Sequence, residues 1–335
     1  MRTDARSQRR RCPDGHACGK EGAAVARRAD RPMTTFAEKL HDERIADELR
    51  AAGLDPDHVA RLARATVEED LGGGVDVTSE ATVSADARAV ADYVARKPGV
   101  AAGIYVAAAV IDLVSGGDAE FEFPLEDGAR VEPGTVLFTA SAHTRDLLTA
   151  ERSALNLLCH MSGIAGITRQ WVDAVEGTGA KIRDTRKTTP GLRLIEKYAV
   201  RCGGGVNHRM FLSDAGLVKD NHVLAAGGVV EAFESVRAKY PDLPVEVEVD
   251  TLDQLLPVVE AGAELILLDN FTPERMRAAV MLVGRNEPYG RTRLEASGGL
   301  TLDQARAVAE TGVDYISVGG LTHSAAILDV GCDFR

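Results

Sequence analysis

The sequence predicts an α/β fold in which the second half of the chain forms a barrel of parallel strands. Short apolar segments alternate with helical stretches from about residue 180 onward, a pattern typical of parallel strands joined by crossover helices. Each apolar segment ends in charged residues, polar residues or glycines. They are Arg186 and Lys187, Lys219, Glu248, Asp269, Ser297 with Gly298 and Gly299, and Gly319 with Gly320. In a barrel all these strand ends would converge on one face.

An open, doubly wound sheet would also fit the alternation, with its strand ends spread along a crevice. The segment VEVEVD, residues 245–250, favours the barrel. Its alternation places Glu246, Glu248 and Asp250 on one side of the strand and three valines on the other. A strand covered by helices on both faces would be apolar on both, so one acidic side indicates a polar barrel interior.

The amino-terminal segment, residues 1–32, is rich in Arg, Ala and Gly and has neither helical periodicity nor an apolar run. We therefore interpret it as a disordered extension rather than a signal peptide, with Met33 as a candidate start of translation. Cys12, His16 and Cys18 lie close together in this extension. Three such ligands do not complete the four-ligand set of a structural zinc site.

A small α+β domain is predicted for residues 33–148. Residues 56–71 carry apolar side chains at helical spacing and are followed by three glycines, which end the helix. Residues 99–114 are apolar and Ala-rich but too short to span a membrane, so we expect a packed helix. Asp127-Gly128 and Pro133-Gly134 are turn signals between short β-prone segments.

A second domain, residues 149–321, is predicted to begin with a helix that Thr149 caps. Arg152, Asn156 and His160 follow at intervals of four residues, which places them on one polar stripe of that helix. A later helix is expected from about residue 190 to residue 202.

Composition narrows the class of function. The net charge is -12 and aromatic residues make up 4% of the chain, which argues against nucleic acid as a partner. No apolar run approaches the ~20 residues of a membrane-spanning helix. The five cysteines are scattered and odd in number, so a disulfide framework is not expected and a cytoplasmic location is.

One segment of this acidic chain is basic. Residues 181–222 hold nine Lys or Arg and four Asp or Glu. Arg193, Lys197 and Arg201 recur every four residues and are interpreted as the solvated face of a helix. Arg186, Lys187, Arg209 and Lys219 lie instead at strand ends or beside glycines, where a barrel builds its site. Forked guanidinium groups and lysine point charges suit a small ligand with several negative charges.

Glycines and carboxylates complete the predicted site. The last two strands end in SGG and VGG, and glycines at these positions of a barrel commonly let backbone N–H groups bind phosphate. Neither an ATPase P-loop nor a dinucleotide-binding glycine motif occurs. Glu248 and Asp269, on successive strands, could hold ribose hydroxyls or Mg²⁺ bridged to phosphate, and could also pair with Lys219 and Lys187.

Six segments resemble the quinolinate phosphoribosyltransferase family. They are TAERSALNLLCHMSGIAG, DTRKTTPGLRLIEKYAVRCGGGVNHR, DAGLVKDNH, VEVEVD, LLDNF and LEASGGL. EEDLGGGVDVTSEAT resembles the amino-terminal segment of the same family, so the resemblance runs from about residue 34 to the end. The DTRKTTPG and GGGxNHR blocks are highly specific. Gly166 is a departure, since the family's usual motif is SGIAT.

The resemblance implies an incomplete α/β barrel of the type II phosphoribosyltransferase kind, with an amino-terminal domain that residues 322–335 join. It implies a homodimer, with larger assembly left open. The reaction it implies joins quinolinate and phosphoribosyl pyrophosphate, with Mg²⁺, into nicotinate mononucleotide, pyrophosphate and CO₂, a step of NAD biosynthesis.

The family's site residues can be carried onto this chain position by position. The quinolinate-binding cations fall on Arg186, His208, Arg209 and Lys219, with Arg152 reaching the site of the neighbouring subunit. The residues for phosphoribosyl pyrophosphate and Mg²⁺, directly or through substrate oxygens, fall on Lys187, Glu248 and Asp269, which are also the expected catalytic residues. Thr185 and the phosphate loops complete the substrate-binding set: Ser297, Gly298, Gly299, Val318, Gly319 and Gly320.

Three other functions are weighed against this one. A sibling phosphoribosyltransferase would use another aromatic acid, such as nicotinate, without decarboxylation. A barrel aldolase would use Lys187 or Lys219 as a Schiff base and would need a lysine of lowered pKa. A catalytically inactive nucleotide-binding protein would bind phosphoribosyl pyrophosphate without turnover, but Lys187, Glu248 and Asp269 are all present.

Overall fold

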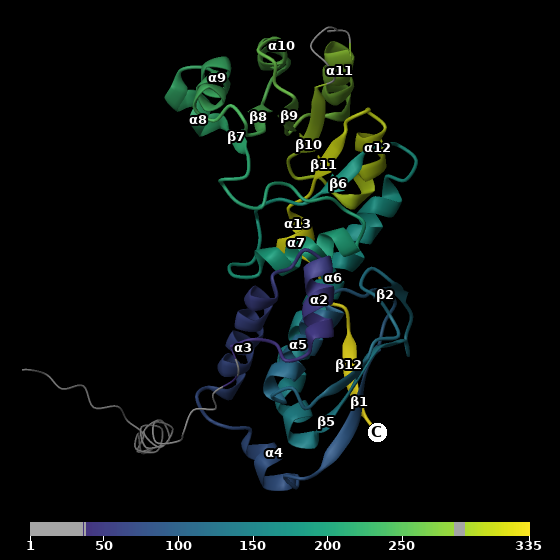
Figure 1. The fold of residues 1–335 in the computed structure, drawn as a ribbon. Helices are drawn as coiled ribbons and strands as arrows, with labels where there is room; N and C mark the ends of the chain where they lie inside the picture. Colours follow the sequence, from purple (N-terminus) through teal and green to yellow (C-terminus); the bar gives the residue numbers. More distant parts are fainter. Residues whose placement is uncertain (1–35, 37, 285–291) are drawn as a thin grey trace, which may run out of the picture.

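The computed structural model describes residue 36, residues 38–284 and residues 292–335. The predicted extension, residues 1–32, lies outside them, as do its cysteines. The described chain forms two parts that share one long helix, α6 (Thr144–Ala174), which runs from the amino-terminal part into the barrel (Figure 1). No described helix is long and apolar enough to cross a membrane.

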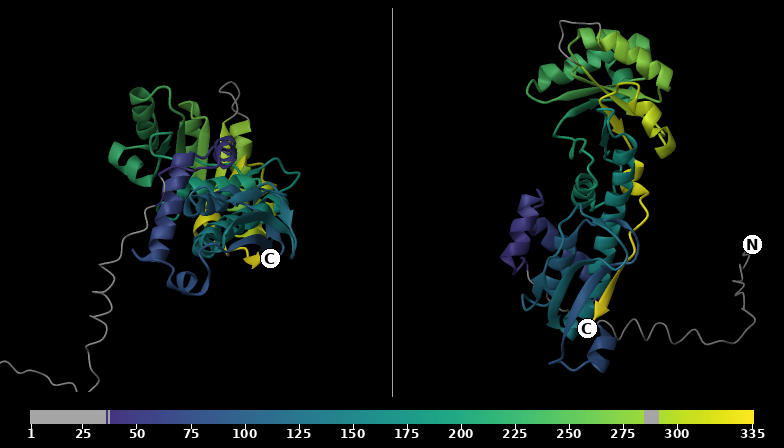
Figure 2. Two further views of the ribbon diagram at one scale, coloured as in Figure 1. Left: turned by 60° about the horizontal axis from the view of Figure 1, so that its bottom comes forward. Right: turned by 90° about the vertical axis from the view of Figure 1, so that its right-hand side faces the viewer.

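The amino-terminal part combines four helices with an antiparallel sheet (Figure 2). The helices are α2 (Glu43–Ala51), α3 (Pro56–Leu71), α4 (Val77–Thr82) and α5 (Ile104–Val114). Asp42, Asp55 and Asp76 cap the first three through backbone N–H groups. Gly72, with a φ of 57°, ends α3 as predicted. Nine of the 11 residues of α5 are buried, which confirms the packed helix.

The sheet of this part has the strand order β12-β1-β5-β3. Its strands are β1 (Arg88–Ala95), β3 (Glu120–Glu122), β5 (Val136–His143) and β12 (Val330–Phe334), with β2 (Gly99–Val100) and β4 (Arg130–Val131) paired beside it. The carboxyl-terminal strand therefore lies in the amino-terminal sheet, with Tyr93 opposite Cys332. Tyr93 stacks on Phe138 of β5 at a centroid distance of 4.2 Å.

Helix α6 begins at Thr144, directly after β5, so the expected start at Thr149 is wrong. The boundary drawn between residues 148 and 149 falls inside this helix, and the domain bounds stay a prediction. Gly163 lets the chain before β12 cross α6 closely, because an added Cβ there would overlap the Ala326 carbonyl oxygen. At Gly166 an added Cβ would meet nothing within 4 Å, so close packing does not require a glycine there.

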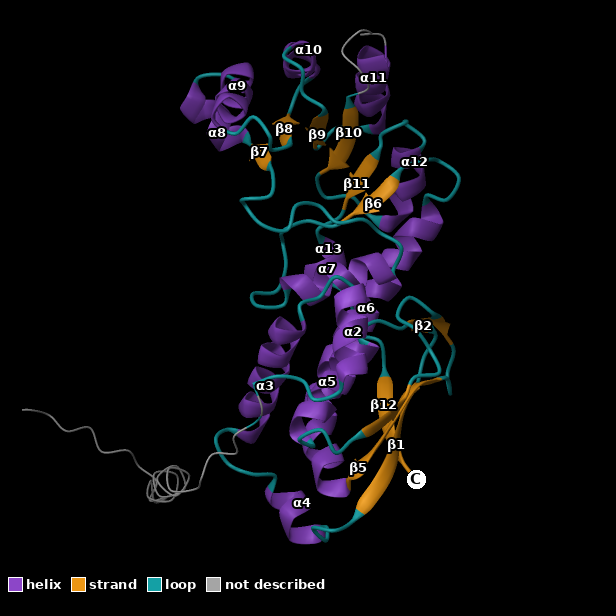
Figure 3. Cartoon of the chain, in the orientation of Figure 1, coloured by secondary structure: helices purple, strands orange, loops and turns teal. Residues whose placement is uncertain are grey.

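Six parallel strands form the barrel, in the order β6-β11-β10-β9-β8-β7. They are β6 (Lys181–Arg183), β7 (Gly216–Val218), β8 (Val245–Val249), β9 (Leu265–Asp269), β10 (Arg293–Ser297) and β11 (Tyr315–Ser317). Because the first strand lies beside the last, the strands follow a ring, and an open sheet with a switch point is excluded. The ring is open between β6 and β7, which confirms the incomplete barrel (Figure 3).

The outside of the ring is covered by α8 (Asp220–Ala226), α9 (Val229–Lys239), α10 (Leu252–Glu260), α11 (Pro273–Gly284) and α12 (Ala305–Ala309), which follows the short turn η1 (Leu302–Gln304) (Figure 1). The strand ends face α6, α7 (Arg193–Cys202) and α13 (Gly320–His323). Helix α7 begins three residues later than predicted. Glu246 of β8 is only 3% exposed, so the acidic side of that strand does face the barrel interior.

Candidate active site

A pocket of about 1050 Å³ opens at the carboxyl ends of the barrel strands. Almost every site residue expected from the sequence lines it. These are Thr185, Arg186, Lys187, His208, Arg209, Lys219, Glu248, Asp269, Ser297, Gly298, Gly299, Val318, Gly319 and Gly320. Arg152 does not: it is an exposed residue of α6, outside this pocket.

The cationic wall of the pocket comes from the loops that follow β6 and α7. Arg209 donates from Nη1 to the Ala215 carbonyl at 2.7 Å. The Nε atoms of Arg186 and Arg209 are buried and have no hydrogen-bond partner among the described residues. Burial lowers the pKa of the Arg209 guanidinium, and the neighbouring charge of Arg186 lowers it further. Two guanidinium groups with unfilled donors favour an anionic ligand with several acceptor oxygens.

The carboxylates stand on adjacent strand tips. Glu248 of β8 forms an ion pair with Lys219 at the end of β7, as the sequence suggested. Asp269, at the end of β9, accepts a hydrogen bond from Asn270 Nδ2 at 2.6 Å. No ion pair joins Asp269 to Lys187 in the described part of the chain. Asp269 is thus free to contact a cation or a ribose hydroxyl in the pocket.

The glycine loops follow β10 and β11. Gly298 has a φ of 106°, and an added Cβ would overlap the side-chain oxygen of Asn270. Asn270 itself has a φ of 54°, a left-handed conformation. At Gly319 an added Cβ would lie 3.1 Å from Lys187 Cδ. Both glycines therefore let backbone approach the pocket where a side chain would fill it.

Beneath these tips lies a buried polar layer that the sequence reading did not assign to the site. Arg183 forms an ion pair with Glu295, and Ser317 donates from Oγ to the same carboxylate. Glu246 lies beside them, and one of its oxygens, Oε1, is buried without a partner among the described residues. Burial raises the pKa of both glutamates. The alternation in VEVEVD indicated that Glu246 points inward, and no comparable signal marked Glu295.

His208 joins this layer to the pocket. Its Nδ1 accepts the backbone N–H of Arg209 at 2.7 Å, so the neutral ring must carry its proton on Nε2. That Nε2 lies 2.8 Å from Glu246 Oε2 and 3.8 Å from Glu295 Oε1. Burial lowers the pKa of His208 to about 4, against the raising effect of the carboxylates. From the sequence we counted His208 among the cations, whereas the lowered pKa and the N–H that its Nδ1 accepts favour a neutral imidazole.

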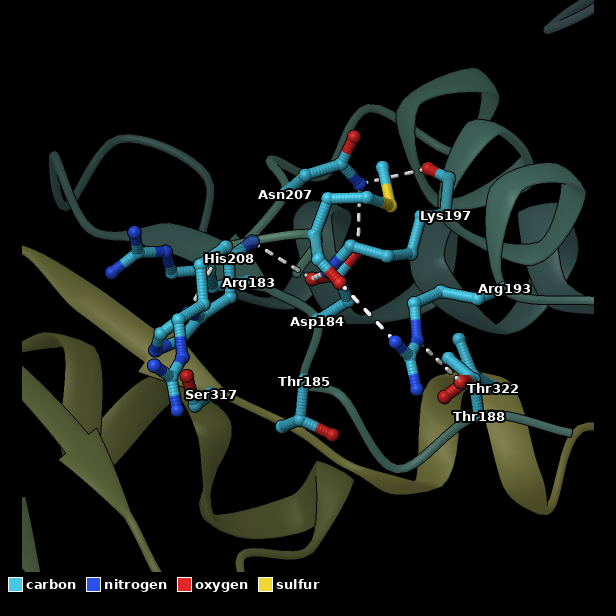
Figure 4. Close-up of polar contacts among 12 residues, drawn as sticks. Arg183, Asp184, Thr185, Thr188, Arg193, Lys197, Asn207, His208, Ser317 and Thr322 are labelled. Atoms are coloured by element: carbon cyan, nitrogen blue, oxygen red, sulfur yellow. Dashed lines mark hydrogen bonds and ion pairs between the residues drawn. The ribbon is translucent and has the colours of Figure 1, made fainter. Parts of the chain in front are cut away.

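Helix α7 corrects a second expectation. Lys197 was interpreted as solvated, but its side chain is fully buried and forms an ion pair with Asp184, which is also fully buried (Figure 4). Arg193 is half-buried, and among these three cations only Arg201 is exposed. The charged face of α7 therefore packs against the loops that carry the site residues, and periodicity alone could not distinguish it from a solvated face.

The sequence matches two family models. The model described as quinolinate phosphoribosyl transferase, C-terminal domain, matches residues 164–333, and that of the N-terminal domain matches residues 76–162. A nicotinate-nucleotide pyrophosphorylase (carboxylating) from Mycobacterium leprae is 54% identical over 271 residues, covering 81% of this chain and 95% of that one. A probable enzyme of the same name from Bacillus subtilis is 40% identical over 266 residues, covering 79% and 89%.

Solved structures agree with this match. The nicotinate-nucleotide pyrophosphorylase from Francisella tularensis superposes with a TM-score of 0.78 at 36% identity, covering 83% of this chain and 96% of that one. Human nicotinic acid phosphoribosyltransferase reaches a TM-score of 0.53 at 12% identity, covering 82% and 73%. The second similarity concerns the fold alone.

Proposed function

The chain belongs to the quinolinate phosphoribosyltransferase family, and from this premise we propose that the pocket at its strand ends binds quinolinate beside phosphoribosyl pyrophosphate. The chain is an enzyme that transfers the phosphoribosyl group to quinolinate with decarboxylation. The products are nicotinate mononucleotide, pyrophosphate and CO₂, in NAD biosynthesis. We propose here which of its residues carry out this reaction.

One observation carries the assignment of the quinolinate site: the buried Nε atoms of Arg186 and Arg209 have no hydrogen-bond partner within the part of the chain that the structure describes. Quinolinate is a dianion with two adjacent carboxylates, and a pocket with two unfilled guanidinium donors matches it. Phosphoribosyl pyrophosphate is also anionic, so bringing the two substrates together costs Coulomb energy unless cations lie near both. Lys187 and Lys219 supply further positive charge at the same strand ends.

The bonds change in two stages. The pyridine nitrogen forms a bond to the anomeric carbon of the ribose while the bond to pyrophosphate breaks, and positive charge develops on the sugar. Glu248 and Asp269 line the pocket where their negative charge can stabilise it. The quaternised nitrogen then stabilises the electron pair left on C2 as CO₂ departs, and C2 takes up a proton. The protein contributes positioning and electrostatics, and no covalent nucleophile is required.

We propose Mg²⁺ as the cofactor, held with substrate oxygens by Glu248 and Asp269. Carboxylates on adjacent strand tips, with an open pocket beside them, are the oxygen donors that this ion favours. When bound, Mg²⁺ would neutralise charge on the leaving pyrophosphate. In the structure Lys219 forms an ion pair with Glu248. When quinolinate and Mg²⁺ bind, this pair would break, and Lys219 would pair with a carboxylate of quinolinate instead.

We also propose a homodimer in which Arg152 of one subunit completes the site of the other. Arg152 lies exposed on α6 and outside the pocket of its own chain, which is compatible with a role across a subunit boundary. A cytoplasmic location fits the free thiols of Cys159, Cys202 and Cys332.

The proposed function is tested by pyrophosphate release from phosphoribosyl pyrophosphate and Mg²⁺. Quinolinate should support release and nicotinate should not. Equal release with nicotinate would favour the sibling activity, and tight binding without release would favour an inactive nucleotide-binding protein. Borohydride treatment with a carbonyl substrate should label neither Lys187 nor Lys219, whereas labelling would support the aldolase.

A further inference from the structure

Asp184 and Lys197 form a buried ion pair that no step of the proposed mechanism uses. Both side chains have zero exposure. Burial raises the pKa of the Asp184 carboxyl and lowers the pKa of the Lys197 ammonium, each shift being opposed by the charge of the other. A buried ion pair stabilises a fold little compared with apolar residues of similar size, so stability alone does not account for it.

The position of the pair in the chain is specific. Asp184 immediately precedes Thr185, Arg186 and Lys187, which line the pocket. Its Oδ1 accepts the backbone N–H of His208 at 2.8 Å, and its Oδ2 accepts Asn207 Nδ2 at 2.6 Å (Figure 4). One carboxylate therefore connects the start of the loop 184–189 to the segment 207–210, which carries His208 and Arg209.

Helix α7 contacts both segments. Lys197 contributes its ammonium to Asp184 and its carbonyl to Asn207 Nδ2, at 2.8 Å. Arg193, one turn earlier on the same face, donates to Thr188 Oγ1 at 3.1 Å and to the Met210 carbonyl at 3.3 Å. Lys197 and Arg193 thus each contact both segments, Lys197 through its ammonium and its backbone carbonyl and Arg193 through its guanidinium.

Glu196, which lies between Arg193 and Lys197 on that face, makes a further contact with the loop 184–189. Glu196 is fully buried, accepts the backbone N–H of Thr189 at 3.0 Å and contacts His160 of α6 at 2.9 Å. The face of α7 formed by Arg193, Glu196 and Lys197 is polar, yet it lies against protein. None of these three side chains lines the pocket.

We propose that Asp184, fixed by Lys197, is a positioning residue that sets the distance between the two groups of quinolinate-binding cations. This inference rests on the proposed function, because it assumes that Arg186 and Arg209 bind quinolinate. A displacement of about 1 Å between such groups can cost roughly 100-fold in kcat/KM. Neither Asp184 nor Lys197 lines the pocket.

Two variants test the connection. Asp184→Asn combined with Lys197→Met removes both charges and so avoids an unpaired buried ion. Asn207→Ala removes the contact from the other segment. Both should raise the quinolinate KM about tenfold or more. Asp112→Asn is the matched control, because Asp112 is also fully buried and accepts two backbone N–H groups, from His41 and Asp42, in the amino-terminal part. Its quinolinate KM should stay within about twofold of wild type.

A second readout does not depend on turnover. Amide hydrogen exchange of residues 184–189 and 207–210 should accelerate together in both variants and stay unchanged in the control. Folded variants with the quinolinate KM and the exchange rates of wild type would overturn the proposal. If wild-type protein fails to turn over quinolinate, the proposed function is wrong, and the exchange rates still decide whether Asp184 connects the two segments.

Discussion

His208 Nε2 lies 2.8 Å from Glu246 Oε2, while its Nδ1 accepts the backbone N–H of Arg209. Both ring nitrogens are therefore engaged within the protein. A neutral imidazole in this position donates to Glu246 and presents its ring, rather than a positive charge, to the pocket. In the proposed site, Arg186, Arg209 and Lys219 therefore supply the positive charge that binds quinolinate.

The first prediction concerns the protonation of His208. Its ring should titrate with a pKa of about 4 and carry its proton on Nε2 at pH 7. Nitrogen-15 NMR of labelled histidine, with His208→Gln to assign the signal, measures both. A ring with a pKa near 6.5 or higher would contradict the buried neutral form.

The lowered pKa of His208 also predicts how the stability of the protein depends on pH. Between pH 6.5 and about 4 the unfolded chain binds a proton at His208 that the folded chain does not. The contribution of His208 is therefore fully present above pH 6.5 and is lost as the pH falls toward 4, by up to roughly 3 kcal/mol. Charged neighbours face the ring from β6, α7, β8 and β10. These neighbours also respond to pH or charge; they are Glu246, Glu295, Arg183, Asp184 and Lys197. The quantity to compare is therefore the difference in unfolding free energy between wild type and His208→Gln.

A second prediction follows from the ion pair of Lys219 and Glu248. In the proposed mechanism quinolinate binds Lys219 and Mg²⁺ binds Glu248. Either ligand must then break the pair, which leaves the other residue available for the second ligand. Calorimetry should show that Mg²⁺ with pyrophosphate tightens quinolinate binding about fivefold or more. In Glu248→Gln this coupling should vanish, because the amide holds Lys219 weakly. Equal quinolinate affinity with and without Mg²⁺ and pyrophosphate in wild type would refute it.

The phosphate loop gives a third prediction. Gly298→Ala places a Cβ against Asn270 at a φ of 106°, so the loop must shift. We expect kcat/KM for phosphoribosyl pyrophosphate to fall more than about tenfold. Gly134→Ala is the control: its φ is 90°, an added Cβ meets nothing within 4 Å, and it lies in the amino-terminal part. It should lose some stability but keep its kinetics, and equal kinetic effects would show that backbone strain alone is responsible.

The fourth prediction tests the shared site. Arg152→Ala and Lys219→Ala should each be inactive, and an equal mixture that exchanges subunits should recover about a quarter of wild-type activity. Half of the dimers would be mixed, each with one intact site. A mixture of Arg186→Ala and Lys219→Ala should recover nothing, because both residues belong to the same pocket. Recovery in neither mixture would mean that Arg152 does not act across subunits.

The strand-tip residues could be predicted from sequence because parallel strands in a ring end on one face. That rule was enough to predict that Arg186, Glu248 and Asp269 lie in one pocket. It could not find Glu295, whose partner Arg183 is 112 positions away and gives no local pattern. Nor could helical periodicity reveal that Lys197 is buried, since a charged face packed on a buried carboxylate has the same spacing as a solvated one. The start of α6 was missed because β5 runs into it without a turn signal.

The most direct measurement follows CO₂ and nicotinate mononucleotide together, using quinolinate labelled in the 2-carboxylate with phosphoribosyl pyrophosphate and Mg²⁺. Wild-type protein should release one CO₂ for each nicotinate mononucleotide formed. Arg186→Ala should lose most of this activity or need far more quinolinate, because we propose that the guanidinium of Arg186 binds quinolinate. Formation of the nucleotide from nicotinate without CO₂, or unchanged kinetics in Arg186→Ala, would contradict the assignment of this pocket to quinolinate.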